Sequence, residues 1–149
     1  MSDTRLYVHA LYCDDIRHEV GGKVTYVGTY GPDMFVPEFP FVVPKLCVAL
    51  FISMPWELEA RKVTARVSLD DDPIADFDAD IESVVTQQLS DPSFGPDEVT
   101  RRILMTYFSV GGLELKAPGL IRPLVRVDDD EMRGPALEIL QRPDQPRQD

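Results

Sequence analysis

Apolar and polar residues alternate with a period of two along much of this chain, and this pattern predicts short β-strands. The clearest case spans residues 63–69, where Val, Ala, Val and Leu at the odd positions alternate with Thr, Arg and Ser. In the next stretch, residues 75–81, apolar residues alternate with Asp76, Asp78 and Asp80. Such alternation is typical of a strand with one face in the core and one in water. We therefore expect these two strands to form a hairpin across the turn at residues 70–73.

The first thirty residues predict a hairpin of a different kind. Residues 6–16 and 23–30 are rich in Val, Tyr and Thr, and Gly21-Gly22 lies between them. Two adjacent glycines can take the positive φ angles that a tight type I′ turn requires. The first strand is apolar at nearly every position, which predicts burial on both faces. Gly28 interrupts the second strand, where we expect a bulge or a close backbone contact.

Four further segments show strand-like patterns. Residues 45–52 and 103–110 are apolar on both faces and predict central strands, and Gly111-Gly112 after the second indicates either a bulge or a turn. Residues 121–127 and 137–139 predict a final pair across the acidic turn at residues 128–134. Residues 35–44 contain three prolines and predict a covering loop or an edge segment. Asp97 and Glu98 suit the start of a short helical turn ending at Arg102.

Seven or eight short strands without a helix of ten residues predict an antiparallel β-sandwich. An immunoglobulin-like arrangement is the first expectation, and a C2-like sandwich is the alternative. A length of 149 residues suits a single domain, which we expect to span residues 1–142. Residues 143–149 are polar without periodicity and predict a disordered tail.

Composition narrows the possible partners and the compartment. The net charge of −11 argues against binding to nucleic acid or to an anionic membrane. Prolines and a lysine break the longest apolar run, residues 39–56, and predict no membrane span. The N-terminus lacks a secretory signal pattern, so the expected location is cytoplasmic. Cys13 and Cys47 lie in apolar strand-like runs, which favours reduced, packed thiols over a disulfide.

One string carries a resemblance. Residues 15–30 contain Asp15-Ile16-Arg17 and Glu19, then Gly21-Gly22-Lys23, Gly28 and Tyr30. In this spacing the chain resembles the opening of an uncharacterised family of small bacterial and phage-borne domains of unknown function. The resemblance covers the N-terminal hairpin and implies a β-rich, stand-alone domain. It implies no activity, ligand or functional residue.

Acidic turns are the first candidates for chemistry, because Ca²⁺ prefers several carboxylate and carbonyl oxygens that converge from separate loops. If eight strands alternate in direction, the connections after the odd-numbered strands share one end of the sandwich. That end would gather Glu57 and Asp97 with the candidate metal ligands Asp14, Asp15, Asp128, Asp129 and Asp130. The alternative interpretation is that aspartates form good turns and a soluble surface, and we favour it. His9, Cys13 and His18 lack the spacing of a zinc site, and we expect packed thiols there.

These observations favour a small non-enzymatic interaction module without a cofactor, whose partner is a protein. Trp56, next to Pro55 at a predicted strand end, is a candidate interface anchor. Ile139 lies in the last predicted strand, which we expect to form an open sheet edge suited to a homodimer. The alternative function is an acidic-loop, calcium-binding C2-like module.

Overall fold

The structure is a computed structural model that describes residues 6–55, 61–80 and 101–143 of the chain. Within these ranges the chain forms ten strands and no helix, so no described helix could cross a membrane. The predicted tail at residues 143–149 lies outside the described residues beyond position 143. The strands are β1 (Tyr7–His18), β2 (Val24–Thr29), β3 (Asp33–Val36), β4 (Phe41–Pro55), β5 (Lys62–Leu69), β6 (Asp72–Asp80), β7 (Arg101–Leu115), β8 (Gly119–Val127), β9 (Asp130–Arg133) and β10 (Leu137–Gln141).

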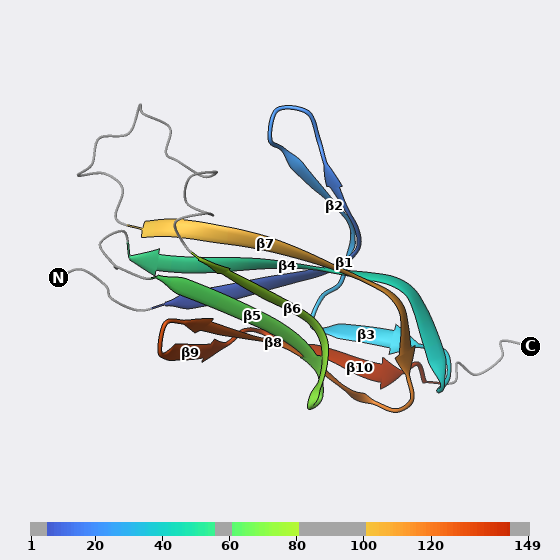
Figure 1. The fold of residues 1–149 in the computed structure, drawn as a ribbon. Helices are drawn as coiled ribbons and strands as arrows, with labels where there is room; N and C mark the ends of the chain where they lie inside the picture. Colours follow the sequence, from blue (N-terminus) through green and yellow to red (C-terminus); the bar gives the residue numbers. More distant parts are fainter. Residues whose placement is uncertain (1–5, 56–60, 81–100, 144–149) are drawn as a thin grey trace, which may run out of the picture.

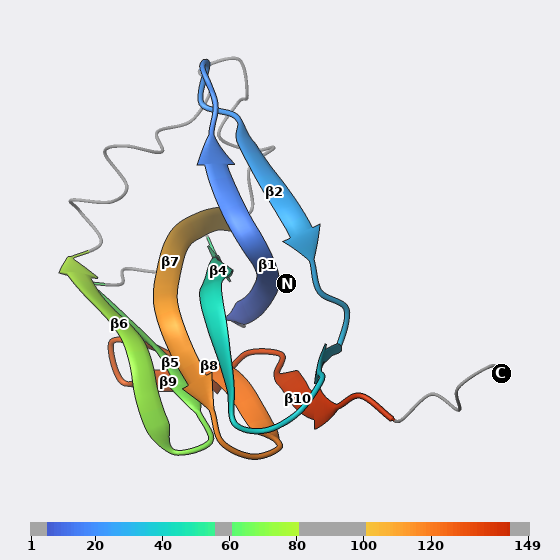
Figure 2. The same cartoon turned by 90° about the vertical axis from the view of Figure 1, so that its right-hand side faces the viewer.

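The strands build two sheets that face each other in a sandwich-like arrangement (Figures 1 and 2). Sheet A is antiparallel, with the strand order β2-β1-β4-β7. Sheet B has the order β3-β10-β8-β5-β6, and β9 adds to β8. The predicted all-β, two-sheet architecture is confirmed.

Two details of the predicted sandwich are wrong. The described strands exceed the expected seven or eight, because β3 forms at the start of the proline-rich segment and β9 forms within the acidic turn, each with four residues. Sheet B is also mixed rather than antiparallel, since β3 pairs with β10 in the parallel direction. Strands this short carry too few residues for alternation to be recognised in the sequence.

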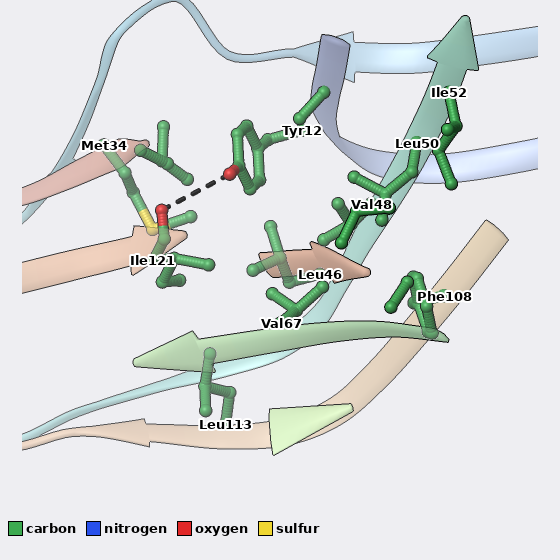
Figure 3. Packing of buried hydrophobic residues seen from close by; sticks show 14 of the residues in the cluster. Tyr12, Met34, Leu46, Val48, Leu50, Ile52, Val67, Phe108, Leu113 and Ile121 are labelled. Atoms are coloured by element: carbon green, nitrogen blue, oxygen red, sulfur yellow. Dashed lines mark hydrogen bonds between the residues drawn. The ribbon is translucent and has the colours of Figure 1, made fainter. Parts of the chain in front are cut away.

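Apolar side chains from the inner faces of both sheets form the core (Figure 3). The alternation predicted for β5 is confirmed, since Val63 and Val67 have no exposed surface while Arg66 between them is exposed. Burial of these side chains is the main force that holds the sheets together, at about 25 cal/mol for each Å² of apolar surface. Sheet A contributes its inner layer chiefly through Leu46, Val48, Leu50, Ile52 and Met54 of β4.

The pair β4–β7 continues without a register shift from Phe41 opposite Leu115 to Pro55 opposite Arg101. Gly112 has a φ of 63°, but the strand passes through both glycines, so they form neither the bulge nor the turn expected from the sequence. The predicted helical turn ending at Arg102 is wrong at that end, because Arg101 and Arg102 begin β7. Asp97 and Glu98 lie outside the described residues.

Tyr12 connects the two sheets directly. Its hydroxyl donates a hydrogen bond of 2.7 Å to the carbonyl oxygen of Pro135 and lies 3.3 Å from that of Ile121, the contact drawn in Figure 3. Pro135 lies between β9 and β10, and the preceding Gly134 N–H donates to the carbonyl of Pro123 on β8. β9 and β10 therefore follow the same edge of β8, and Tyr12 of sheet A fixes the point where the chain passes between them.

The expected open edge at the last strand is wrong. β10 lies between β8 and β3, and the side chain of Ile139 has no exposed surface. The physical reason is again β3, which pairs with β10 and supplies the backbone partners that an edge strand would lack. Ile139 is thus a core residue, without the exposed side chain that a partner-binding role needs.

Candidate functional site

Sheet A has an outer face, on the side away from sheet B, where positions from three strands align. The register places residues of β1, β4 and β7 in rows, beginning with Tyr7, Ser53 and Ile103. Paired residues point to the same side of a sheet, and the positions between these rows are the buried ones of the core. We call the twelve aligned residues the neutral face: Tyr7, His9, Leu11, Cys13, Cys47, Ala49, Phe51, Ser53, Ile103, Met105, Tyr107 and Ser109.

None of these twelve residues is Asp, Glu, Lys or Arg. Charged residues make up 28% of the chain, and they reappear just beyond both ends of the neutral face, with Arg101 at one end and the ion pair of Lys45 and Asp15 at the other. A face that met only water would have no reason to exclude them, whereas depletion of charge together with aromatic residues and Met is typical of the buried centre of an interface. The composition of the neutral face therefore differs from that of an ordinary solvated sheet.

Aromatic rings of the β1–β2 hairpin cover the middle of the neutral face. The ring of His18 lies 5.1 Å from that of Tyr107, edge to face, and the ring of Tyr26 lies 6.4 Å from that of Phe51. His9 adds a third contact, with its ring centroid 5.9 Å from that of Phe51. Such pairs stabilise by about 0.5–1.5 kcal/mol beyond their buried area. Burial and the bond to Tyr107 raise the pKa of Tyr26 to about 12.

The two cysteines are neighbours on the neutral face. Cys13 and Cys47 are opposite each other in the register, and both are free and buried. Burial, followed by the neighbouring Cys47, raises the pKa of the Cys13 thiol, which disfavours the reactive thiolate. These contacts agree with packed thiols.

The end of the neutral face that holds Tyr7 is partly exposed. Tyr7 is 46% exposed, Ile103 54% and Met105 41%. The guanidinium of Arg101 lies 4.8 Å from the centre of the Tyr7 ring, and its Nε donates to the Ser53 hydroxyl at 2.8 Å. The cation of Arg101 thus marks the border of the accessible region.

The outer face of sheet B has the opposite character. Arg66, Asp76, Asp78 and Arg126 all point outward from β5, β6 and β8 and are exposed. Ion pairs join Arg126 to Glu131 at 2.7 Å and Lys62 to Asp78 at 3.1 Å. The same chain therefore builds one charged outer face and one neutral outer face.

Asp14 and Asp15 lie where the hairpin meets the body of sheet A. Asp14 accepts a hydrogen bond of 2.8 Å from the Tyr30 hydroxyl, and Asp15 forms an ion pair of 2.6 Å with Lys45. The hydrogen bond from Lys45 is the main cause that lowers the pKa of Asp15 below its ordinary value. Both carboxylates thus have protein partners.

The acidic turn at residues 128–130 does not lie near Asp14 and Asp15. Asp128 has a φ of 50°, and its Oδ1 accepts hydrogen bonds from the backbone N–H groups of Arg61 and Lys62. Asp129 and Asp130 are exposed beside it. Figure 1 shows this β8–β9 turn near the start of β1, whereas Asp14 and Asp15 lie toward its hairpin end. In the described parts of the chain, no three His, Cys, Asp or Glu residues come together as a metal ligand set.

Gly28, where the sequence predicts a bulge or a close backbone contact, lies against the Asp14 side chain in a strand pair without a register shift. Its φ is 66°, and a Cβ atom there would collide with the Asp14 carboxylate. Gly22 has a similar φ of 76°, but a Cβ atom there would have no neighbour within 4 Å. We expect Gly28→Ala to lower the free energy of unfolding by about 2–3 kcal/mol, and Gly22→Ala by about 1 kcal/mol. Urea unfolding of both variants measures the difference, and equal losses would contradict the close contact.

Sequence reasoning missed the neutral face, although its signal is present. The odd positions of residues 7–13, 47–53 and 103–109 all lack charge, but only the register shows that they are neighbours. Trp56, the predicted interface anchor, lies outside the described residues.

Comparison with known proteins identifies the family. The model of DUF6941, a family of unknown function, matches residues 8–140, which is most of the chain and not the N-terminal hairpin alone. No curated protein and no solved structure matches. The chain therefore belongs to DUF6941, a family of unknown function.

Proposed function

We propose that this chain is a non-enzymatic interaction module that binds a second copy of itself through the neutral face. The observation that carries the proposal is the absence of charged residues from the twelve aligned positions of the neutral face, in a chain with a net charge of −11. Desolvating charged groups is costly, and the neutral face avoids that cost. The charged outer face of sheet B offers no such advantage.

The distribution of charge also favours a second copy of the chain as the partner. Two identical acidic molecules repel each other, and a two-fold contact places each patch against its own copy. Over the neutral face such a contact brings no like charges together, whereas over an acidic surface it would. A basic partner would be attracted to the acidic residues elsewhere on the chain and not to the neutral face. The neutral face therefore suits a second copy.

The small area of the neutral face predicts a weak dimer. Three strands about 4.8 Å apart and seven residues rising about 3.4 Å each span roughly 350 Å² in projection, and the aromatic rings of the hairpin already cover the middle of this area. A stable interface buries about 800 Å² on each partner. The neutral face thus supplies the centre of an interface, and we expect dissociation in the micromolar range.

Sedimentation over a wide range of protein concentration tests the proposal. We expect a monomer–dimer equilibrium that shifts toward the dimer as salt screens the repulsion between the acidic copies. Met105→Glu places a charge on the neutral face and should weaken the dimer by about tenfold or more. Phe35→Glu is the matched control, because it makes the same change at a 49% exposed residue of β3, on the edge of sheet B, and should leave association unchanged.

Two outcomes would contradict the neutral face as the contact. A dimer that Phe35→Glu dissociates and Met105→Glu spares would move the contact to the β3 edge of sheet B. A monomer under every condition would leave a different protein as the partner of the neutral face.

The finer assignments belong to the same proposal. An immunoglobulin-like topology, with a C2-like one as the alternative, and a bacterial, cytoplasmic setting are expectations from the sequence. Asp14 and Asp15 lie apart from Asp128, and this separation argues against the alternative calcium-binding function.

A further inference from the structure

The outer face of sheet B contains a group of arginines around one leucine. Leu124 of β8 points outward, with Arg66 of β5 opposite it on one side and Arg133 of β9 opposite it on the other. Arg122 and Arg126 flank it along β8, two residues away in each direction, and so share its side of the sheet. Four guanidinium groups therefore surround one apolar side chain.

Only one of these four arginines has a carboxylate partner among the described residues. Arg126 is paired with Glu131 at 2.7 Å. Within the same ranges of the chain, no Asp or Glu lies within ion-pair distance of Arg66, Arg122 or Arg133. Asp76 is opposite Arg66 in the register without forming an ion pair. In a chain with 26 acidic and 15 basic residues, three unpaired arginines at one place are unexpected.

The three unpaired arginines line a common depression. It has a volume of about 440 Å³, with Leu124 and Pro123 contributing apolar surface and Ser68 a hydroxyl. Asp70 and Asp71 also line it, with the Asp70 carboxylate accepting a hydrogen bond of 3.0 Å from the N–H of Leu120, so the three arginines exceed the carboxylates of the lining by one positive charge. The depression thus offers several strong hydrogen-bond donors that the described part of the chain leaves unused.

From this arrangement we infer that Arg66, Arg122 and Arg133 form a binding site for a small oxyanion that carries at least two negative charges. A guanidinium group presents two parallel N–H donors that match two oxygens of a phosphate or carboxylate. Bound oxygens would also relieve the repulsion among three neighbouring cations. The net charge of −11 opposes a long polyanion such as nucleic acid, which selects a small ligand.

Calorimetric titration of the full chain at low salt with inorganic pyrophosphate and, separately, with citrate tests the site. We expect one site per chain, and stronger binding of one probe distinguishes a phosphate source from a polycarboxylate source. Arg66→Gln, Arg122→Gln and Arg133→Gln should each weaken binding by about tenfold or more. Arg126→Gln is the matched control, because it makes the same charge change on the same face at the arginine already paired with Glu131. Its effect should stay within about twofold.

Three results would overturn the inference. Failure of both probes to bind would mean that the arginines form only a solvated surface. An equal loss of binding in Arg126→Gln would indicate a general charge effect and no defined site. Binding of duplex DNA or RNA without binding of either small probe would indicate a nucleic-acid surface. Anion binding and self-association can be tested separately, because the three arginines lie on the outer face of sheet B and Met105 lies on the outer face of sheet A.

Discussion

Val67→Asp is expected to abolish stable folding. The Val67 side chain has no exposed surface, and its strand β5 lies between β6 and β8 in the middle of sheet B. An aspartate there would place an unpaired carboxylate among apolar side chains, at a cost of about 4 kcal/mol or more. A domain of this size has a total stability of about 5–15 kcal/mol, so the loss removes much or all of it.

Ser68→Asp is the matched control for this substitution. Ser68 is the next residue, points to the outer face and lies opposite Arg122, so an added carboxylate meets water and a cation. We expect a change in the free energy of unfolding of about 0.5 kcal/mol or less. Soluble yield and urea unfolding of the two variants measure the contrast. Equal behaviour would mean that the register of β5 is wrong.

Tyr12→Phe is expected to lower the free energy of unfolding. Tyr12 is 4% exposed, and its hydroxyl is the donor that joins sheet A to the carbonyl of Pro135. The substitution leaves that acceptor without its partner, at a cost of about 1–3 kcal/mol. Urea unfolding at neutral pH measures the loss. A neutral effect would mean that water replaces the hydroxyl at Pro135.

The same hydroxyl predicts a dependence of stability on alkaline pH. Burial raises the pKa of Tyr12 above the ordinary value of 10, and the positive charge of Arg122 offsets only part of this increase. Below pH 10 both the folded and the unfolded states keep the proton, so the stabilisation is complete. Above pH 10 the unfolded state releases the proton first, and the free energy of unfolding falls.

Tyr12→Phe should therefore show a shallower decline in stability than the wild type as pH rises above 10. Tyr30, whose pKa burial raises to about 12, and Tyr26 contribute to the decline in both proteins. Unfolding measured in parallel at neutral pH and just above pH 10 gives the two slopes. Identical slopes would contradict burial of the Tyr12 hydroxyl.

Strands with one solvent-exposed face and one buried face could be predicted from the sequence. β5 and β8 follow their predicted alternation, since each polar residue that pointed inward would cost free energy. β3 and β9 could not be predicted, because a four-residue strand depends on its neighbours more than on its own composition. Missing them also made the last strand an expected edge and misassigned the acidic turns, since the position and direction of later strands depend on the count.

Neither candidate surface could be predicted from the sequence, because each combines residues that lie far apart along the chain. The neutral face joins residues near positions 7, 53 and 103, and the arginine site joins Arg66 to Arg122 and Arg133. Register decides which of these residues are neighbours, and register follows from packing across the whole sandwich. Arg133 was further hidden because it lies in a segment that the sequence assigns to a turn.

The parallel pairing of β3 with β10 has a consequence for synthesis on the ribosome. Asp33–Val36 can complete sheet B only when Leu137–Gln141 has emerged, and Tyr12 must likewise wait for Pro135. The β1–β2 hairpin is local and can form early, but Met34 and Val36, buried in the folded domain, lack the neighbouring strand β10 until Leu137–Gln141 has been made. The nascent chain thus presents an apolar segment while about a hundred further residues are added.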